Sequence, residues 1–197
     1  MLELLLVRHG MTAGNKLSRY IGRGTDEPLS DEGKQMLSGH SGEIPQLVYV
    51  SPMLRCRQSA EIIFPGCPLK VVEELAECDF GEFENKNYQE LDGNEAYQKW
   101  IDSNGTLPFP GGESREEFRT RNLLGFQKVL EHCFANEIKR AALVIHGGTI
   151  MNIMENLTGE EDSFYRWHVK NGEGYVIGLS KDEQPEGRNC LAFYRKI

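Results

Sequence analysis

The stretch LELLLVRHG, residues 2–10, starts as a run of apolar residues and ends in two basic side chains followed by a glycine. A short, almost continuous apolar run is typical of a strand that is buried on both faces of a sheet. We therefore expect a strand over residues 2–8, with His9 just beyond its carboxyl end. Gly10 has no Cβ, so the backbone can turn tightly after His9.

Further apolar segments alternate with helix-like segments along the rest of the chain. Buried strands joined by helices favour an α/β fold of three layers, with a mostly parallel central sheet and helices on both faces. Among the strands, residues 141–145 (AALVI) form the clearest buried one. The other strands are expected at residues 46–50, 69–72, 175–179 and 190–194, with a turn containing Pro185 and Gly187 between the last two.

Local signals mark where the helices begin. Ser51-Pro52 is expected to start a helix, because proline suits the first helical position. Ser114 and Glu117 have the spacing of a capping box at the start of a long helix. The remaining helices are expected over residues 30–41, with Ser30 as the N-cap, and from Gly147 to about Asn156.

The composition indicates one globular domain over residues 1–197, because hydrophobic residues make up 39% of the chain and charged residues 26%. No apolar run approaches the roughly 20 residues that span a bilayer. The apolar start, residues 1–7, lacks the basic beginning and the cleavage site of a signal peptide. We therefore expect a cytoplasmic protein without a membrane partner.

The cysteines and the net charge argue against further classes of protein. The five cysteines are odd in number and form no CxxC pair, which predicts free thiols and no metal site. The net charge of −8 argues against a nucleic-acid partner, since such surfaces are usually basic. The same negative field slightly repels an anionic substrate, so local arginines must overcome it at short range.

Basic side chains follow three of the expected strands. Arg8 and His9 come at the end of the first strand, Arg55 lies on the helix after the second, and His146 and Gly147 follow residues 141–145. Ligands of such sheets bind beyond the carboxyl ends of the strands. Each side chain alone has an ordinary explanation, such as a turn histidine or a solvated arginine. Together they indicate an anion-binding site.

Glu77 is the candidate acid. It lies between apolar and small residues, and a partly desolvated carboxyl group has a pKa raised toward the range useful for acid catalysis. Glu73, Glu74 and Asp79 are close in sequence, so an ordinary charged loop is an equally good interpretation from composition alone.

Short motifs occur between residue 2 and about residue 180. They are LVRHGMT at 6–12 with Asn15, then Gly22, DEPLS at 26–30 with Gly33, SPMLR at 51–55, Glu77 before DFG at 79–81, GGES at 111–114, and HGG at 146–148. In this order they resemble the histidine phosphatase superfamily, also called the phosphoglycerate-mutase-like fold.

The resemblance implies five catalytic side chains. His9 would be the nucleophile that becomes phosphorylated, and Glu77 the proton donor. Arg8, Arg55 and His146 would surround the phosphoryl oxygens. Phosphoryl transfer needs mainly alignment and charge neutralisation, which these cationic and imidazole groups supply without a metal ion or another cofactor.

The resemblance also implies a binding set. Asn15 and the backbone N–H of Gly22 would position the substrate, and Thr12 and Gly147 would complete the phosphate site. The partner implied is a small-molecule phosphate ester. No oligomeric state is predicted.

Within the superfamily, the chain resembles a phosphatase more than a mutase. Mutases are similar to one another in having a serine at the position of Ile21. The paired arginines that mutases have in the insertion after the Glu77 stretch are also missing here. Met11, Ser59 and residues 83–85 also depart from common family patterns, but none of these changes removes a catalytic group. Residues 22–30 look most like those of α-ribazole phosphatase, an enzyme of cobalamin biosynthesis.

Two alternatives stay open. One is a phosphoglycerate mutase. The other is an inactive phosphate-binding relative, which should have lost His9 or Glu77, although both are present. Residues 82–113 are expected to form a cap over the site, whose aromatic residues would suit a bulky leaving group. An ordinary surface insertion whose aromatic residues complete the core is an equal alternative.

Overall fold

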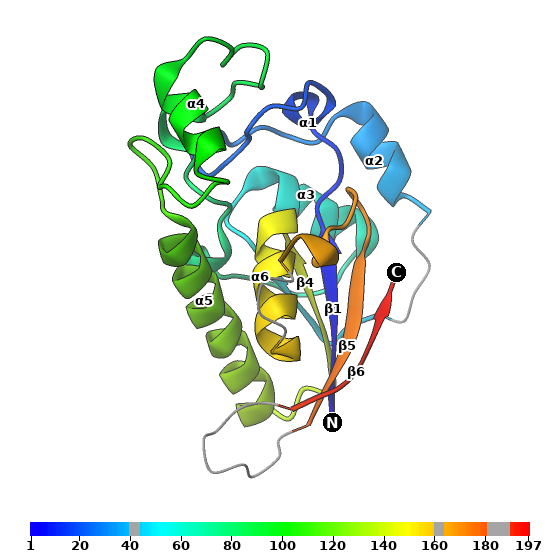
Figure 1. The fold of residues 1–197 in the computed structure, drawn as a ribbon. Coiled ribbons are helices and arrows are strands. Elements are labelled where there is room, and N and C mark those ends of the chain that lie inside the picture. Colours follow the sequence, from blue (N-terminus) through cyan, green and yellow to red (C-terminus); the bar gives the residue numbers. More distant parts are fainter. Residues whose placement is uncertain (40–43, 160–163, 181–189) are drawn as a thin grey trace.

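One six-stranded sheet organises the molecule (Figure 1). The computed structural model describes residues 1–39, 44–159, 164–180 and 190–197. The strand order is β3-β2-β4-β1-β5-β6. The strands are β1 (Leu2–Arg8), β2 (Leu47–Val50), β3 (Leu69–Val71), β4 (Arg140–Ile145), β5 (Gly174–Ser180) and β6 (Cys190–Lys196).

The sheet is mostly parallel, as expected. Strands β3, β2, β4 and β1 pair in parallel, whereas β5 is antiparallel to both β1 and β6. In the centre of the sheet, Arg8 at the end of β1 is in register with Ile145 at the end of β4. The residues that follow these two strands, His9 and His146, therefore leave the sheet side by side.

Helices cover both faces of the sheet, which confirms the three-layer α/β fold. On one face, α5 and α6 pack on Leu2, Leu4 and Leu6 of β1. On the other, α2 and α3 pack around Val7. The α-helices are α1 (Ala13–Lys16), α2 (Asp31–Leu37), α3 (Leu54–Ile63), α4 (Glu95–Asp102), α5 (Arg115–Ala135) and α6 (Gly147–Thr158), with 3-10 turns η1 (Glu73–Leu75), η2 (Gly81–Phe83) and η3 (Phe164–Trp167).

Two predicted caps are confirmed. The Ser30 hydroxyl accepts the N–H of Gly33 at 3.0 Å and starts α2. Ser114 and Glu117 form the reciprocal capping box of α5.

Two helix boundaries were predicted incorrectly. Helix α2 ends at Leu37, before the expected end near residue 41, which lies outside the described residues. Pro52 is not the first residue of α3, which begins at Leu54. There the Asp26 carboxylate accepts the Leu54 N–H at 2.6 Å, a contact between distant parts of the chain that sequence patterns do not show. The expected turn at Pro185 and Gly187 lies outside the described residues.

The state of the cysteines and the character of the helices can be given for the described ranges. Cys56, Cys67, Cys78 and Cys133 are free thiols. In the same ranges, no helix combines the length and the apolar character needed to cross a bilayer.

The segment 82–113 forms a compact unit around α4, next to α1 and at the end of the molecule where the parallel strands finish (Figure 1). Six aromatic rings pack on one another there, with centroid distances between 5.0 and 6.4 Å. They include Tyr20, which lies outside the segment and fastens it to the loop that carries Gly22. Tyr88 stands apart and is 62% exposed. The six rings are those of Tyr20, Phe80, Phe83, Tyr97, Trp100 and Phe109.

Gly33 permits the close approach of α2 to the turn after His9. A Cβ at Gly33 would lie 2.0 Å from the backbone oxygen of Met11. That oxygen is held by the N–H and hydroxyl of Ser30 at 2.9 and 3.1 Å, so it has little room to move.

We expect Gly33→Ala to destabilise the protein by about 1–3 kcal/mol in denaturant unfolding. This clash exceeds the roughly 1 kcal/mol that alanine gains over glycine in a helix. Gly39→Ala is the matched control, because a Cβ at Gly39 would meet no atom within 4 Å. Equal stability of the two variants would contradict the steric argument.

Candidate active site

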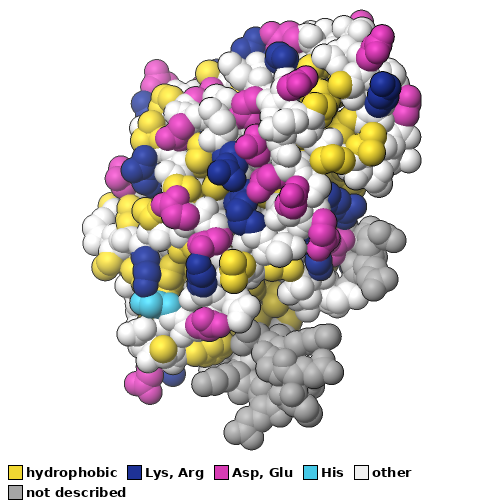
Figure 2. All heavy atoms as spheres, turned by 90° about the vertical axis from the view of Figure 1, so that its left-hand side faces the viewer, with side chains coloured by type: hydrophobic (Ala, Val, Ile, Leu, Met, Phe, Trp, Pro, Cys, Tyr) yellow, Lys and Arg dark blue, Asp and Glu magenta, His cyan; other side chains and the backbone are white. Residues whose placement is uncertain are grey.

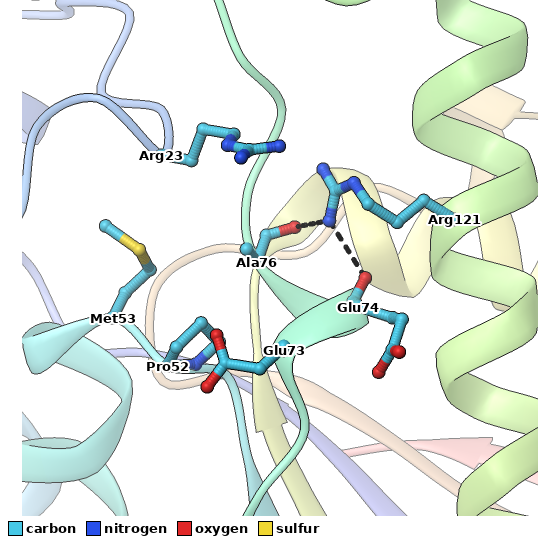
Figure 3. Close-up of a pocket in the computed structure, with 7 residues that line it drawn as sticks. All are labelled: Arg23, Pro52, Met53, Glu73, Glu74, Ala76 and Arg121. Carbon is cyan, nitrogen blue, oxygen red and sulfur yellow. Dashed lines mark hydrogen bonds between the residues drawn. The ribbon is translucent and has the colours of Figure 1, made fainter.

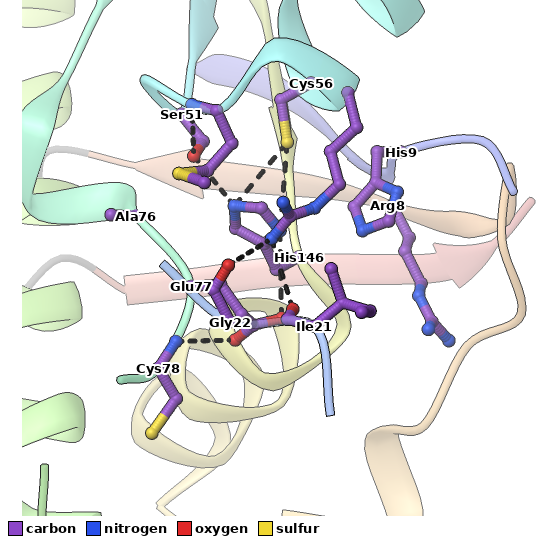
Figure 4. Close-up of polar contacts among 12 residues, drawn as sticks. Arg8, His9, Ile21, Gly22, Ser51, Cys56, Ala76, Glu77, Cys78 and His146 are labelled. Carbon is purple, nitrogen blue, oxygen red and sulfur yellow. Dashed lines mark hydrogen bonds and ion pairs between the residues drawn. The ribbon is translucent and has the colours of Figure 1, made fainter. Parts of the chain in front are cut away.

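His9 and His146 lie against each other at the carboxyl edge of the sheet (Figure 4). Their ring centroids are 5.2 Å apart and their planes meet at 67°. His9 is only 3% exposed and His146 is fully buried. Two strand-end histidines that could each have been ordinary turn residues are therefore brought into one site.

The hydrogen bonding of His9 fixes which ring nitrogen can react. Nδ1 lies 2.7 Å from the backbone oxygen of Gly10, and a carbonyl can only accept, so Nδ1 carries the proton. The lone pair is then on Nε2. Burial lowers the pKa of His9 well below its usual value, and the charges of Arg55 and Arg8 lower it further. His9 is therefore neutral near pH 7, which is the form that a nucleophile needs.

His146 links three groups of the site. Its Nε2 lies 2.7 Å from the Ser51 hydroxyl, and its Nδ1 lies 3.7 Å from Glu77 Oε2. The Cys56 sulfur is 3.6 Å from Nε2. Burial, followed by the charge of Arg55, lowers the pKa of His146 well below its usual value. The ring is thus a neutral hydrogen-bonding group between Ser51 and Glu77.

Arg55 is completely buried and anchored by backbone oxygens. Its guanidinium donates to Thr25 O at 2.9 Å, Gly22 O at 3.1 Å and Ile21 O at 3.3 Å. Its Nε has no partner among the described residues. A guanidinium held by neutral carbonyls keeps its full charge available for an anion.

Arg8 has a similar arrangement on the other side of the site. One terminal nitrogen donates to Val169 O at 2.8 Å, while its buried Nε has no partner in the described ranges. A Cβ on Gly147, the first residue of α6, would lie 3.4 Å from that Nε. The free N–H groups at the start of this twelve-residue helix and the Arg8 guanidinium therefore converge, as expected of an anion site.

Glu77 reaches the site from the loop after η1. Its Oε1 accepts the Cys78 N–H at 2.9 Å, and its side chain is 13% exposed. Burial raises the pKa of Glu77, and the Cys78 N–H, Arg55 and Arg8 only partly offset this effect. The carboxyl group thus holds its proton to a higher pH than an ordinary glutamate, as an acid catalyst requires.

The expected binding residues Thr12, Asn15 and Gly22 already have hydrogen-bond partners within the protein. Thr12 is fully buried, and its hydroxyl caps α1 by accepting the Asn15 N–H at 3.2 Å. Asn15 Oδ1 accepts the Thr12 N–H and the Asn171 amide. The Gly22 N–H donates to Glu84 Oε1 at 2.8 Å, so a substrate would have to compete with that carboxylate.

Other residues of the site are not predictable from sequence patterns. Asn171 donates to the backbone oxygens of His9 and Gly10 at 3.1 and 3.3 Å and joins them to Asn15. The Ser59 hydroxyl accepts the Gly10 N–H at 2.9 Å. Asn171 lies in no motif of the sequence, and Ser59 stands out in the sequence only as a departure from a family pattern.

A pocket of about 380 Å³ lies beside the loop that leads to Glu77 (Figure 3). Arg23, Met53 and Arg121 are among the residues that line it, but neither histidine of the site is. In the described ranges, no group of three or more His, Cys, Asp or Glu side chains could hold a metal ion.

A neutral, buried histidine beside two guanidinium groups at the edge of an α/β sheet suits a protein that binds or cleaves phosphate esters. The chain belongs to the histidine phosphatase superfamily (branch 1), whose family model matches residues 4–187.

Individual relatives carry several names. "Putative phosphoserine phosphatase 2" of Hydrogenobacter thermophilus is 30% identical and covers 100% of this chain and 97% of its own length. "Probable phosphoglycerate mutase GpmB" of Escherichia coli O1:K1 is 30% identical, over 81% of this chain and 76% of its own length.

Solved structures agree on the fold. The α-ribazole phosphatase of Shigella flexneri has a TM-score of 0.81 at 22% identity, covering 96% of this chain and 94% of its own. The phosphoserine phosphatase of Entamoeba histolytica, solved with 3-phosphoglyceric acid, has a TM-score of 0.75 at 25% identity, covering 98% and 96%.

Proposed function

We propose that the chain hydrolyses a small-molecule phosphate monoester through a phosphohistidine formed on His9. The observation that carries this proposal is the state of His9. The ring is buried, neutral and protonated on Nδ1, so that Nε2 offers its lone pair beside the Arg8 and Arg55 guanidinium groups.

In the first step, Nε2 of His9 attacks the phosphorus atom and the bond from phosphorus to the leaving oxygen breaks. Glu77 gives its proton to that oxygen, so that the leaving group departs as a neutral alcohol. The guanidinium groups of Arg8 and Arg55 and the start of α6 neutralise the phosphoryl oxygens. His146 donates a further hydrogen bond from the side that faces Glu77.

In the second step, water attacks the phosphorus of phospho-His9 and the phosphorus–nitrogen bond breaks. The Glu77 carboxylate, deprotonated in the first step, takes the proton of that water. Inorganic phosphate leaves, and His9 and Glu77 return to their starting protonation states. Two easier displacements thus replace one difficult hydrolysis.

The charge of the segment 82–113 supports a monophosphate substrate over a bisphosphate. It contains seven Asp and Glu residues, two Lys and no Arg. The molecular face formed by α5 and this segment carries interspersed acidic and basic side chains, without one broad basic patch (Figure 2). Positive charge is therefore concentrated in the buried site, and the segment would act as an acidic cap over the leaving group.

For the substrate itself, we propose a small-molecule phosphate monoester. The full-length likeness to a protein named for phosphoserine and the similar fold of an α-ribazole phosphatase suggest the first compounds to test. A screen of phosphomonoesters that includes phosphoserine, α-ribazole phosphate and the phosphoglycerates ranks them by kcat/KM.

The screen also separates the three candidate activities. With chelator present, we expect inorganic phosphate release from an aryl phosphate and from at least one metabolite, because the Arg8 and Arg55 side chains supply the positive charge. Interconversion of 3- and 2-phosphoglycerate that depends on added bisphosphoglycerate would instead identify a mutase. No turnover of any ester would identify an inactive phosphate-binding relative.

A further inference from the structure

The loop that carries Glu77 is held by an ion pair that comes from another part of the chain. Arg121 lies on α5, and Glu113 lies just before the N-cap of that helix. The Arg121 Nε donates to Glu113 Oε1 at 2.7 Å, and its NH2 donates to Glu113 Oε2 at 2.8 Å. Both side chains are mostly buried, with exposures of 19% and 15%.

The remaining donors of Arg121 hold the backbone on the N-terminal side of Glu77 and at Glu77 itself. NH1 donates to Glu74 O and Ala76 O, each at 2.9 Å, and NH2 donates to Glu77 O at 3.1 Å (Figure 3 shows the first two). A guanidinium has five N–H donors, so each donor of Arg121 is used. Lysine could not reproduce this planar fork.

Glu113 holds the same loop on the C-terminal side of Glu77. Its Oε2 accepts the Asp79 N–H at 2.9 Å, and its backbone N–H donates to Asp79 O at 2.9 Å. Although burial raises the pKa of Glu113, the hydrogen bonds from Arg121 and Asp79 outweigh burial and leave this pKa below its usual value. Glu113 is therefore ionised near pH 7, and the pair brackets Glu77 from both sides.

We propose that Arg121 and Glu113 are positioning residues that set the place of the Glu77 carboxyl group. The inference rests on the proposed role of Glu77 as proton donor. A donor must come within about 2.6–3.2 Å of the atom it protonates, so even a small displacement of the loop weakens proton transfer. Arg8 and Arg55 are anchored by backbone oxygens outside this loop, so their part in phosphate binding should be little affected.

The test compares Arg121→Lys and Glu113→Gln with the wild type on a series of phosphate esters. With 4-nitrophenyl phosphate, whose leaving group needs little protonation, we expect losses in kcat/KM of about threefold or less. With an alkyl phosphate, we expect losses of about 100-fold, the lower range for removal of an acid catalyst. Arg119→Lys is the matched control, since Arg119 lies on the same helix but faces Glu155 at 3.9 Å. It should retain wild-type behaviour with both esters.

A double-mutant comparison completes the test. In a Glu77→Gln background, Arg121→Lys should cause little further loss with the alkyl ester, because no proton donor remains to be positioned. Equal losses for both esters, or full additivity with Glu77→Gln, would overturn the proposal and leave Arg121 with a purely structural role. If Arg121→Lys does not fold, the same comparison is decided by Glu113→Gln. Failure of the proposed function would appear separately, as an inactive wild type or as no leaving-group dependence in Glu77→Gln.

Discussion

His9→Ala is expected to lower kcat/KM by about 10⁴-fold or more for every phosphate ester, the scale seen when a covalent nucleophile is removed. Alanine offers no group in place of Nε2, which the bond from Nδ1 to the Gly10 carbonyl leaves free to attack. The fold should survive, since the smaller side chain leaves the sheet and its two apolar layers unchanged. Steady-state kinetics, together with circular dichroism and a thermal melt, check both expectations.

His132→Asn is the matched control for this variant. His132 lies near the far end of α5 and bonds the Tyr49 hydroxyl at 2.8 Å, a bond that asparagine can retain. We expect it to keep most of the wild-type activity. A His9→Ala enzyme with more than about a hundredth of the wild-type rate would reveal another nucleophile.

Glu77→Gln is expected to have the second largest effect, and its size should depend on the leaving group. For an alkyl phosphate, we expect kcat/KM to fall by about 10²–10⁴-fold, the usual contribution of general acid catalysis. For 4-nitrophenyl phosphate, the first step should be nearly unaffected, because its leaving group departs without a proton. Phospho-His9 should then accumulate, since the base that activates water is missing.

The pH profile gives an independent check on Glu77. Its pKa is raised by burial, so the acid form persists above the usual range of a glutamate and is lost as the pH rises through that pKa. The alkaline fall in kcat/KM for alkyl esters should therefore disappear in Glu77→Gln. Burial and the charges of Arg55 and Arg8 lower the pKa of His9, so protonation of the nucleophile limits the rate only below the usual pH range of a histidine. Equal losses of Glu77→Gln across the ester series would falsify the role of Glu77.

Much of the fold was predictable because its central strands, such as β4, are buried and read as apolar runs. The run at residues 141–145 differs from β4 by one residue, Arg140. Capping signals also worked where the cap is local, as at Ser30 and Ser114. The prediction at Pro52 was wrong: α3 begins at Leu54, whose N–H donates to Asp26, far away in sequence.

The candidate site, too, was only partly predictable from the sequence. His9 and His146 follow adjacent parallel strands in register, so the sheet-edge rule alone brings them together. The hydrogen bonds of Arg121 to the loop that carries Glu77 could not be predicted. Arg121 looks like an ordinary helix-surface residue until its carbonyl partners are known. Likewise, nothing in the local sequence shows that the Glu84 carboxylate accepts a hydrogen bond from the Gly22 N–H.

The most direct test is to identify the phosphorylated residue. Glu77→Gln is mixed with 4-nitrophenyl phosphate, quenched with alkali within the first turnover and digested for mass spectrometry. We expect one phosphoryl group on the imidazole of His9, stable to alkali and lost in acid, and no such group in the His9→Ala, Glu77→Gln double variant. Phosphate on any other side chain, or no phosphohistidine in a Glu77→Gln enzyme that has released 4-nitrophenol, would contradict the account.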